Sequence, residues 1–142
     1  MDNSNVWFIT VEDASDDIMK AITCIINSTV FSVLAKAGAN PQLNNYYKFN
    51  KQFLEPVPFP VEMLYSGKNV EDLANLYNDI SQIQNIYLNS TFVSRVNIAE
   101  HLNERWSRLD SICNELYGLS EADITMINEI GRTVDRVDLL NR

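Results

Sequence analysis

The sequence predicts an α+β domain that is mostly helical, with short strands in its first half and long helices in its second. Apolar residues recur at helical spacing through most of residues 70–137. The first half contains instead a short run of β-branched and aromatic residues and, further on, a polar loop. With only 4 Gly and 4 Pro in 142 residues, the chain should be ordered. We divide it into a small α+β part, residues 1–69, and a helical part, residues 70–142, within one domain.

The α+β part should begin with a strand and a helix that bends. The sequence VWFITV at residues 6–11 has the composition of a short strand. Ser15 can cap the following helix, and acidic residues come directly after it, where they favour the helix dipole. Residues 27–29, Asn-Ser-Thr, are poor helix formers in the middle of this helix, so we expect a bend or a break there. Gly38 marks its end.

A polar loop and an extended exit complete this part. Residues 38–45, GANPQLNN, have the composition of a loop. A short strand at 46–49 and a brief helical turn at 50–54 should follow. Three alternating prolines, Pro56, Pro58 and Pro60, then require an extended backbone, because each proline also restricts the residue before it.

The helical part should be a long hairpin or coiled-coil pair that leads into a corner. One apolar stripe runs over residues 73–87 and a second over 96–109, and the Asn-Ser-Thr sequence at 89–91 interrupts them. Gly118 can then end a helix in the left-handed conformation, and Ser120 with Asp123 can cap the next helix. We expect four apolar residues to pack this corner: Leu116, Leu119, Ile124 and Ile127.

Composition and charge limit the classes of function. No apolar run approaches the roughly 20 residues that a membrane span needs, and the N-terminus lacks the pattern of a secretory signal. We therefore expect a soluble, cytoplasmic protein in which Cys24 and Cys113 are buried and reduced. The net charge of −8 counts against nucleic-acid binding by the chain as a whole, since DNA affinity depends on neutralising phosphates. Any contact with DNA would need a local basic patch.

Three blocks of sequence resemble one known family. The first is IINSTVF at 25–31, with the pair Asn27-Ser28, and the second is YYKFNKQFLEPVPFP at 46–60, with the exit Pro58-Phe59-Pro60. The third is LDSICNELYGLSEADI at 109–124, in which the matching residues are Asp110, Glu115, Leu116, Tyr117, Gly118, Leu119, Ser120, Asp123 and Ile124. Together they resemble the specificity (target-recognition) region of adenine-N6 DNA methyltransferases of restriction-modification systems. The resemblance covers the chain from about residue 6 to residue 127.

This resemblance implies a catalytic domain elsewhere, in a longer chain or another subunit, which would bind S-adenosylmethionine and the flipped adenine. The family's Asn-Pro-Pro-aromatic loop is not found here, since Asn40-Pro41 is followed by Gln42 and Leu43. We expect this chain alone to be neither an enzyme nor a cofactor-binding protein. We also expect no metal site, because the single histidine, His101, has no second ligand on its face of the helix.

The residues expected to contact DNA lie between the first helix and the proline exit. No Asp or Glu occurs between the acidic start of that helix, Asp16 and Asp17, and Glu55. Lysines can hold phosphates there, and Asn and Gln side chains can pair with adenine edges. The candidate DNA-binding residues are Lys36, Gln42, Asn44, Asn45, Tyr46, Tyr47, Lys48 and Lys51. A solvated loop with two half-buried tyrosines is the alternative.

We therefore expect a non-catalytic module that recognises double-stranded DNA beside a methyltransferase catalytic domain or subunit. On this hypothesis the helices after Val70 brace the module. The alternative is a small acidic interaction protein, either an assembly subunit or an inhibitor of a restriction-modification enzyme, for which the negative charge would suit a partner's positive DNA channel. A third possibility is a homo-oligomer formed through the long helices.

Overall fold

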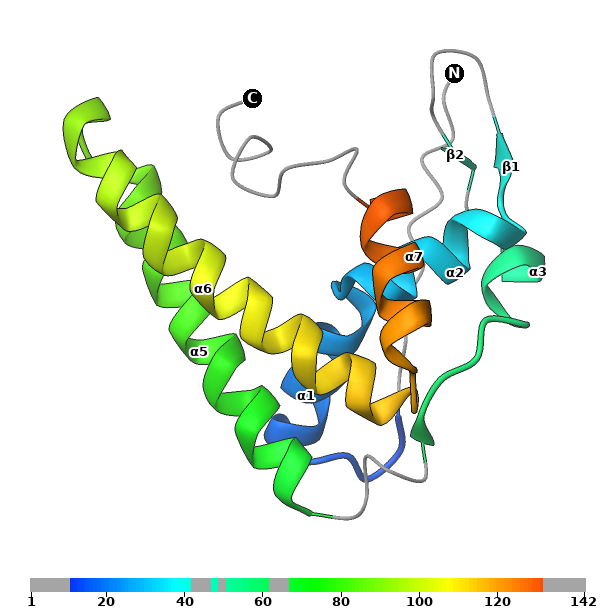
Figure 1. Cartoon of the computed structure of the whole chain (residues 1–142). Helices are drawn as coiled ribbons and strands as arrows, with labels where there is room; N and C mark the ends of the chain where they lie inside the picture. Colours follow the sequence, from blue (N-terminus) through cyan, green and yellow to red (C-terminus); the bar gives the residue numbers. More distant parts are fainter. Residues whose placement is uncertain (1–10, 42–46, 49–50, 62–66, 132–142) are drawn as a thin grey trace, which may run out of the picture.

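The computed structural model describes residues 11–41, 47–48, 51–61 and 67–131, and this part of the chain is all-α. It has five helices of ten residues or more, which pack around one apolar core (Figure 1). They are α1 (Asp16–Ile26), α2 (Thr29–Gly38), α5 (Lys68–Leu88), α6 (Phe92–Leu116) and α7 (Glu121–Gly131). A single turn, α3 (Lys51–Leu54), lies between α2 and α5 in the sequence.

The α+β prediction is therefore wrong. The strand expected at 6–11 lies outside the described residues, apart from Val11. Strands β1 (Asn40–Pro41) and β2 (Tyr47–Lys48) have two residues each and pair antiparallel, with Asn40 opposite Lys48 and Pro41 opposite Tyr47. Such a pair is too short to form a layer that covers a core. The β-branched and aromatic runs gave a local preference for extended structure, whereas the described core is built by helices alone.

Helix α1 begins where the sequence predicts. The Oγ of Ser15 accepts a hydrogen bond from the backbone N–H of Ile18 at 3.3 Å, and Asp16 and Asp17 occupy the first turn. The helix buries Ala21, Ile22, Cys24 and Ile25 and packs along α5. The thiol of Cys24 donates a hydrogen bond to the backbone carbonyl of Leu73 at 3.3 Å, and this bond joins α1 to α5 in the core.

The expected break at 27–29 separates α1 from α2, and the two helices bend by 63°. Ser28 makes the bend specific. Its hydroxyl donates to the carbonyl of Ile25 at 2.6 Å and accepts from the N–H of Phe31 at 3.2 Å, so it ends one helix and caps the next. The residue is completely buried, and these two bonds satisfy its hydroxyl.

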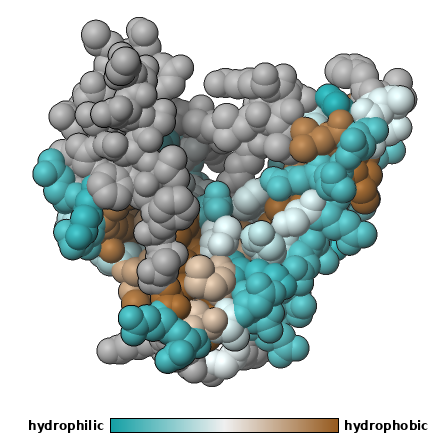
Figure 2. Space-filling model, turned by 180° about the vertical axis from the view of Figure 1, so that it is seen from behind, coloured by the Kyte–Doolittle hydropathy of each residue, from teal (hydrophilic) through white to brown (hydrophobic). Residues whose placement is uncertain are grey.

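Helices α5 and α6 form an antiparallel hairpin, with the chain reversing at the Asn-Ser-Thr sequence 89–91 (Figure 1). Arg95 stabilises the reversal, because its Nε and Nη2 donate to the carbonyls of Tyr87 and Leu88 at 3.2 and 3.3 Å. These carbonyls belong to the last turn of α5, where no intrahelical donor remains. The outer end of the hairpin projects beyond the other helices, and Figure 2 shows hydrophobic surface there among hydrophilic residues. Ile86, Leu88 and Val96 are about half exposed at this end.

The corner between α6 and α7 is confirmed in detail. Gly118 has φ +63°, its N–H donates to the carbonyl of Glu115 at 3.0 Å, and the N–H of Leu119 donates to Asn114 at 3.1 Å. These two bonds are the Schellman pattern that closes a helix. Ser120 and Asp123 then bond reciprocally, with the N–H of each donating to the side chain of the other at 3.0 and 3.3 Å. Leu116 and Ile127 are buried under the corner and Leu119 packs against the core, whereas Ile124, the fourth residue expected here, is half-buried and is not part of the described cluster.

The buried cluster draws on five helices: Ala21, Ile22, Cys24 and Ile25 of α1, Val30 of α2, Leu73, Leu76, Ile80 and Tyr87 of α5, Leu102, Leu109, Cys113 and Leu116 of α6, and Ile127 of α7. Both cysteines are buried free thiols, as predicted. In the part of the chain that the structure describes, no single helix is long and apolar enough to cross a membrane. Only α1 and α2 counted together pass that test, across their 63° bend.

Candidate nucleic-acid interface

The predicted DNA-contacting residues lie on α2, β2 and α3 or between them. Lys36 is half-buried in the last turn of α2, and Lys51 is exposed at the start of α3. Tyr47 and Lys48 form β2, although the positions of their side chains are outside what the structure describes. The remaining four predicted residues, Gln42, Asn44, Asn45 and Tyr46, also lie outside the described residues.

The fold brings the described elements of this set to one end of the molecule, which we call the α2–α3 end. Strand β2 pairs with β1, which follows directly from α2, and α3 packs against α2 (Figure 1). Lys36, Lys48 and Lys51 therefore belong to neighbouring elements. Lys51 also lies 3.8 Å from Glu55, in an exposed pair that contributes little to stability.

The chain's charge is divided unevenly. Residues 18–54 contain four lysines and no acidic residue, which leaves −12 for the rest of a chain whose total is −8. Lys20 is neutralised locally, because its ammonium lies 2.7 Å from the carboxylate of Asp16, and this hydrogen bond raises the pKa of the lysine. The other three lysines of the stretch belong to the α2–α3 end.

Helix α6 holds the N-terminal side of this end. The carboxylate of Asp110 accepts two hydrogen bonds from Thr29, one from its backbone N–H at 2.8 Å and one from its hydroxyl at 2.7 Å. Thr29 is the first residue of α2, so Asp110 places a negative charge at the positive end of that helix dipole. The two residues are 81 positions apart in the sequence.

The C-terminal end of α6 holds the extended exit. The hydroxyl of Tyr117, the C-cap residue of α6, donates to the backbone carbonyl of Pro58 at 2.9 Å. Burial raises the pKa of Tyr117 to about 12, so this hydroxyl remains protonated and able to donate well into the alkaline range. Next to this bond, the rings of Phe59 and Phe31 meet edge to face with centroids 6.3 Å apart. The exit is therefore attached both to α6 and to α2.

The three blocks that carry the family resemblance are thus in direct contact. Thr29, which follows Asn27-Ser28, bonds Asp110, and Pro58 of the proline exit bonds Tyr117. Sequence reasoning identified these residues only as matching letters and missed the ties between them. The sequence offered no signal for Asp110, because an acidic residue directly after Leu109 is ordinary at the edge of the apolar face of a helix.

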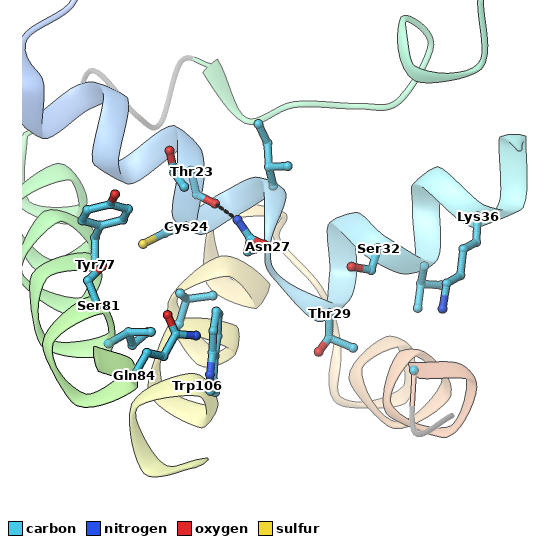
Figure 3. Close-up of a pocket in the computed structure, with 15 residues that line it drawn as sticks. Thr23, Cys24, Asn27, Thr29, Ser32, Lys36, Tyr77, Ser81, Gln84 and Trp106 are labelled. Atoms are coloured by element: carbon cyan, nitrogen blue, oxygen red, sulfur yellow. Dashed lines mark hydrogen bonds between the residues drawn. The ribbon is translucent and has the colours of Figure 1, made fainter. Parts of the chain in front are cut away.

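A groove lies beside this junction, with a cavity of about 510 Å³ (Figure 3). Tyr77, Gln84 and Trp106 of the α5–α6 hairpin line one side, and Thr29, Ser32 and Lys36 of α2 line the other. Cys24 and Asn27 lie between the two sides, and Asn27 donates to the carbonyl of Thr23 at 2.8 Å. Lys36 is the one charged residue among the described lining residues.

In the described part of the chain, no three His, Cys, Asp or Glu side chains gather into a group that could hold an ion. The expectation that His101 has no acidic neighbour on its face is wrong for Glu104, since His101 Nδ1 lies 3.5 Å from that carboxylate. Both side chains are about 70% exposed, so they form at most a weak surface pair.

Comparison with known proteins identifies no relative: no family model, no curated protein and no solved structure matches this chain.

Proposed function

We propose that this chain is a non-catalytic DNA target-recognition module of an adenine-specific DNA methyltransferase from a restriction-modification system. The observation that carries the proposal is the contact between the three resembling blocks. Asp110 bonds Thr29 and Tyr117 bonds Pro58, so residues far apart in the sequence form one junction. The residues that the resemblance groups together therefore also lie together in the fold.

Charge supports the same assignment. The segment between the two ties contains the lysines of the α2–α3 end and several Asn and Gln residues, the side chains that contact phosphates and adenine edges. The remaining −12 would repel DNA if it faced the duplex, so the α2–α3 end is the part that approaches it. The catalytic domain or subunit supplies the rest of the positive field, and it binds S-adenosylmethionine.

The test uses a tagged copy of the chain, which is purified from its own cells together with the proteins bound to it. The affinity of this complex for DNA is then measured at several salt concentrations. We expect the double variant Lys48→Ala/Lys51→Ala to bind a 30-base-pair duplex more weakly. If both lysines contact phosphates, the slope of log K against log salt should become shallower by about 2. Lys20→Ala is the control, because this lysine lies on α1, outside the α2–α3 end. An unchanged slope in the double variant would contradict the proposal.

The acidic balance favours a second candidate, an interaction protein that assembles or inhibits a restriction-modification enzyme. A chain that carries a net charge of −12 outside residues 18–54 can occupy the positively charged DNA channel of a partner. Duplex DNA separates the two candidates when it is added to the complex. A recognition module should stay bound to its partner and bind the DNA, whereas an inhibitor should be released by the DNA.

A further inference from the structure

The first helix of the α2–α3 end depends on α6 for its orientation. Helix α2 has no acidic residue in its own first turn, and its cap Ser28 is completely buried. Both carboxylate oxygens of Asp110 are used on Thr29, one on the N–H and one on the hydroxyl. Ser28 caps α2, and Asp110 attaches this capped start to α6; a charged acceptor with two bonds fixes direction better than a single contact.

The second contact, between Tyr117 and Pro58, is made by the same C-terminal end of α6. Asp110 and Tyr117 are seven residues apart, which is about two helical turns, so both lie on one face of α6. Asp110 holds the start of α2, and Tyr117 holds Pro58 after α3. The chain between Thr29 and Pro58 therefore leaves one side of α6 and returns to the same side. Helix α2 carries it about 15 Å away from this base, at about 1.5 Å per residue.

We infer that Asp110 and Tyr117 are positioning residues for DNA recognition, which act by holding the start of α2 and the exit at Pro58, the described elements on either side of Lys36, Lys48 and Lys51. The inference rests on the proposed function for its DNA part, whereas the holding of the segment is independent of it. A segment fixed at both ends has less conformational freedom to lose on binding, so its affinity for DNA is higher at an unchanged number of phosphate contacts.

Conservative substitutions can test whether these two contacts hold α2 and the proline exit, without removing atoms from the core. Thr29→Val and Tyr117→Phe each delete a hydroxyl and keep the shape of the side chain, and Asp110→Asn removes the charge. Thr125→Val is the matched control, because the exposed hydroxyl of Thr125 bonds the carbonyl of Glu121 within its own helix, α7. In Thr29→Val/Tyr117→Phe, hydrogen exchange should rise at the amides of β2 and α3 and stay unchanged in α5. The control variant Thr125→Val should leave hydrogen exchange unchanged both at β2 and α3 and in α5.

The complex with the 30-base-pair duplex gives the second readout. The double variant should lose about two- to tenfold in affinity at one salt concentration, with its salt slope unchanged. Unchanged exchange at β2 and α3 would overturn the inference, as would faster exchange throughout α5, which would mean a general loss of stability. A shallower salt slope would also overturn it. If the wild-type complex does not bind DNA, the proposed function fails, and the exchange experiment still decides whether the two ties hold the segment.

Discussion

The helical body and the α2–α3 end are stabilised in different ways. In the body, α1, α5, α6 and the corner to α7 share a continuous apolar cluster, in which Leu73 and Leu102 are completely buried. The α2–α3 end contributes Val30 to this cluster, and it is also fixed by specific contacts: Asp110 to Thr29, Tyr117 to Pro58, and the Phe31–Phe59 ring pair. Most of the buried cluster thus belongs to the body, whereas the end combines a smaller buried contribution with directional bonds. A surface that must present polar side chains to a ligand can be held in place this way without being buried.

The largest expected effect is in the body. Leu102→Ala removes a side chain with no exposed surface between α6 and α5, so it should lower the free energy of unfolding by about 2–5 kcal/mol. Chemical denaturation followed by circular dichroism measures this. Val96→Ala on the same helix, at 60% exposure, is the control and should cost less than about 0.5 kcal/mol. Equal losses in the two variants would mean that the hairpin does not pack as described.

A smaller effect is expected where the body touches the α2–α3 end. A Cβ added at Gly131 would lie 2.5 Å from Cγ2 of Thr29, whose side chain is held by Asp110. Gly131→Ala should therefore lower the free energy of unfolding by about 1–3 kcal/mol. Thr29→Ser removes that methyl group and keeps the hydroxyl, so the double variant should recover part of the loss. If Thr29→Ser gives no recovery, the close contact of α7 with α2 is not the cause.

The smallest effect concerns pH at the α6–α7 corner. Hydrogen bonds from Ser120 lower the pKa of the Asp123 carboxyl below its ordinary value. A group whose pKa is lowered by folding stabilises the fold above its unfolded pKa and loses this contribution as the pH falls through the folded value. Ser120→Ala should therefore lower the thermal midpoint at pH 7, with a difference from wild type that shrinks as the solution becomes acidic enough to protonate Asp123. A constant difference across this range would argue against the role of the carboxylate.

The sequence determined the local features of this protein, because each of them depends on neighbouring residues. The break at 27–29, the reversal at 89–91 and the closed corner at Gly118 and Ser120 all follow from residues that cap, end or cannot continue a helix. The free cysteines and the uneven charge could also be inferred from composition and spacing.

Only the tertiary structure decided the fold class and the junction. The strand propensity at 46–49 did not produce a sheet layer, because a strand needs pairing partners that propensity alone does not supply. Strands β1 and β2 pair over just two residues. The bonds from Asp110 to Thr29 and from Tyr117 to Pro58 join residues 81 and 59 positions apart. No periodicity predicts such a contact, since it arises only when the hairpin folds back and brings the end of α6 against the start of α2.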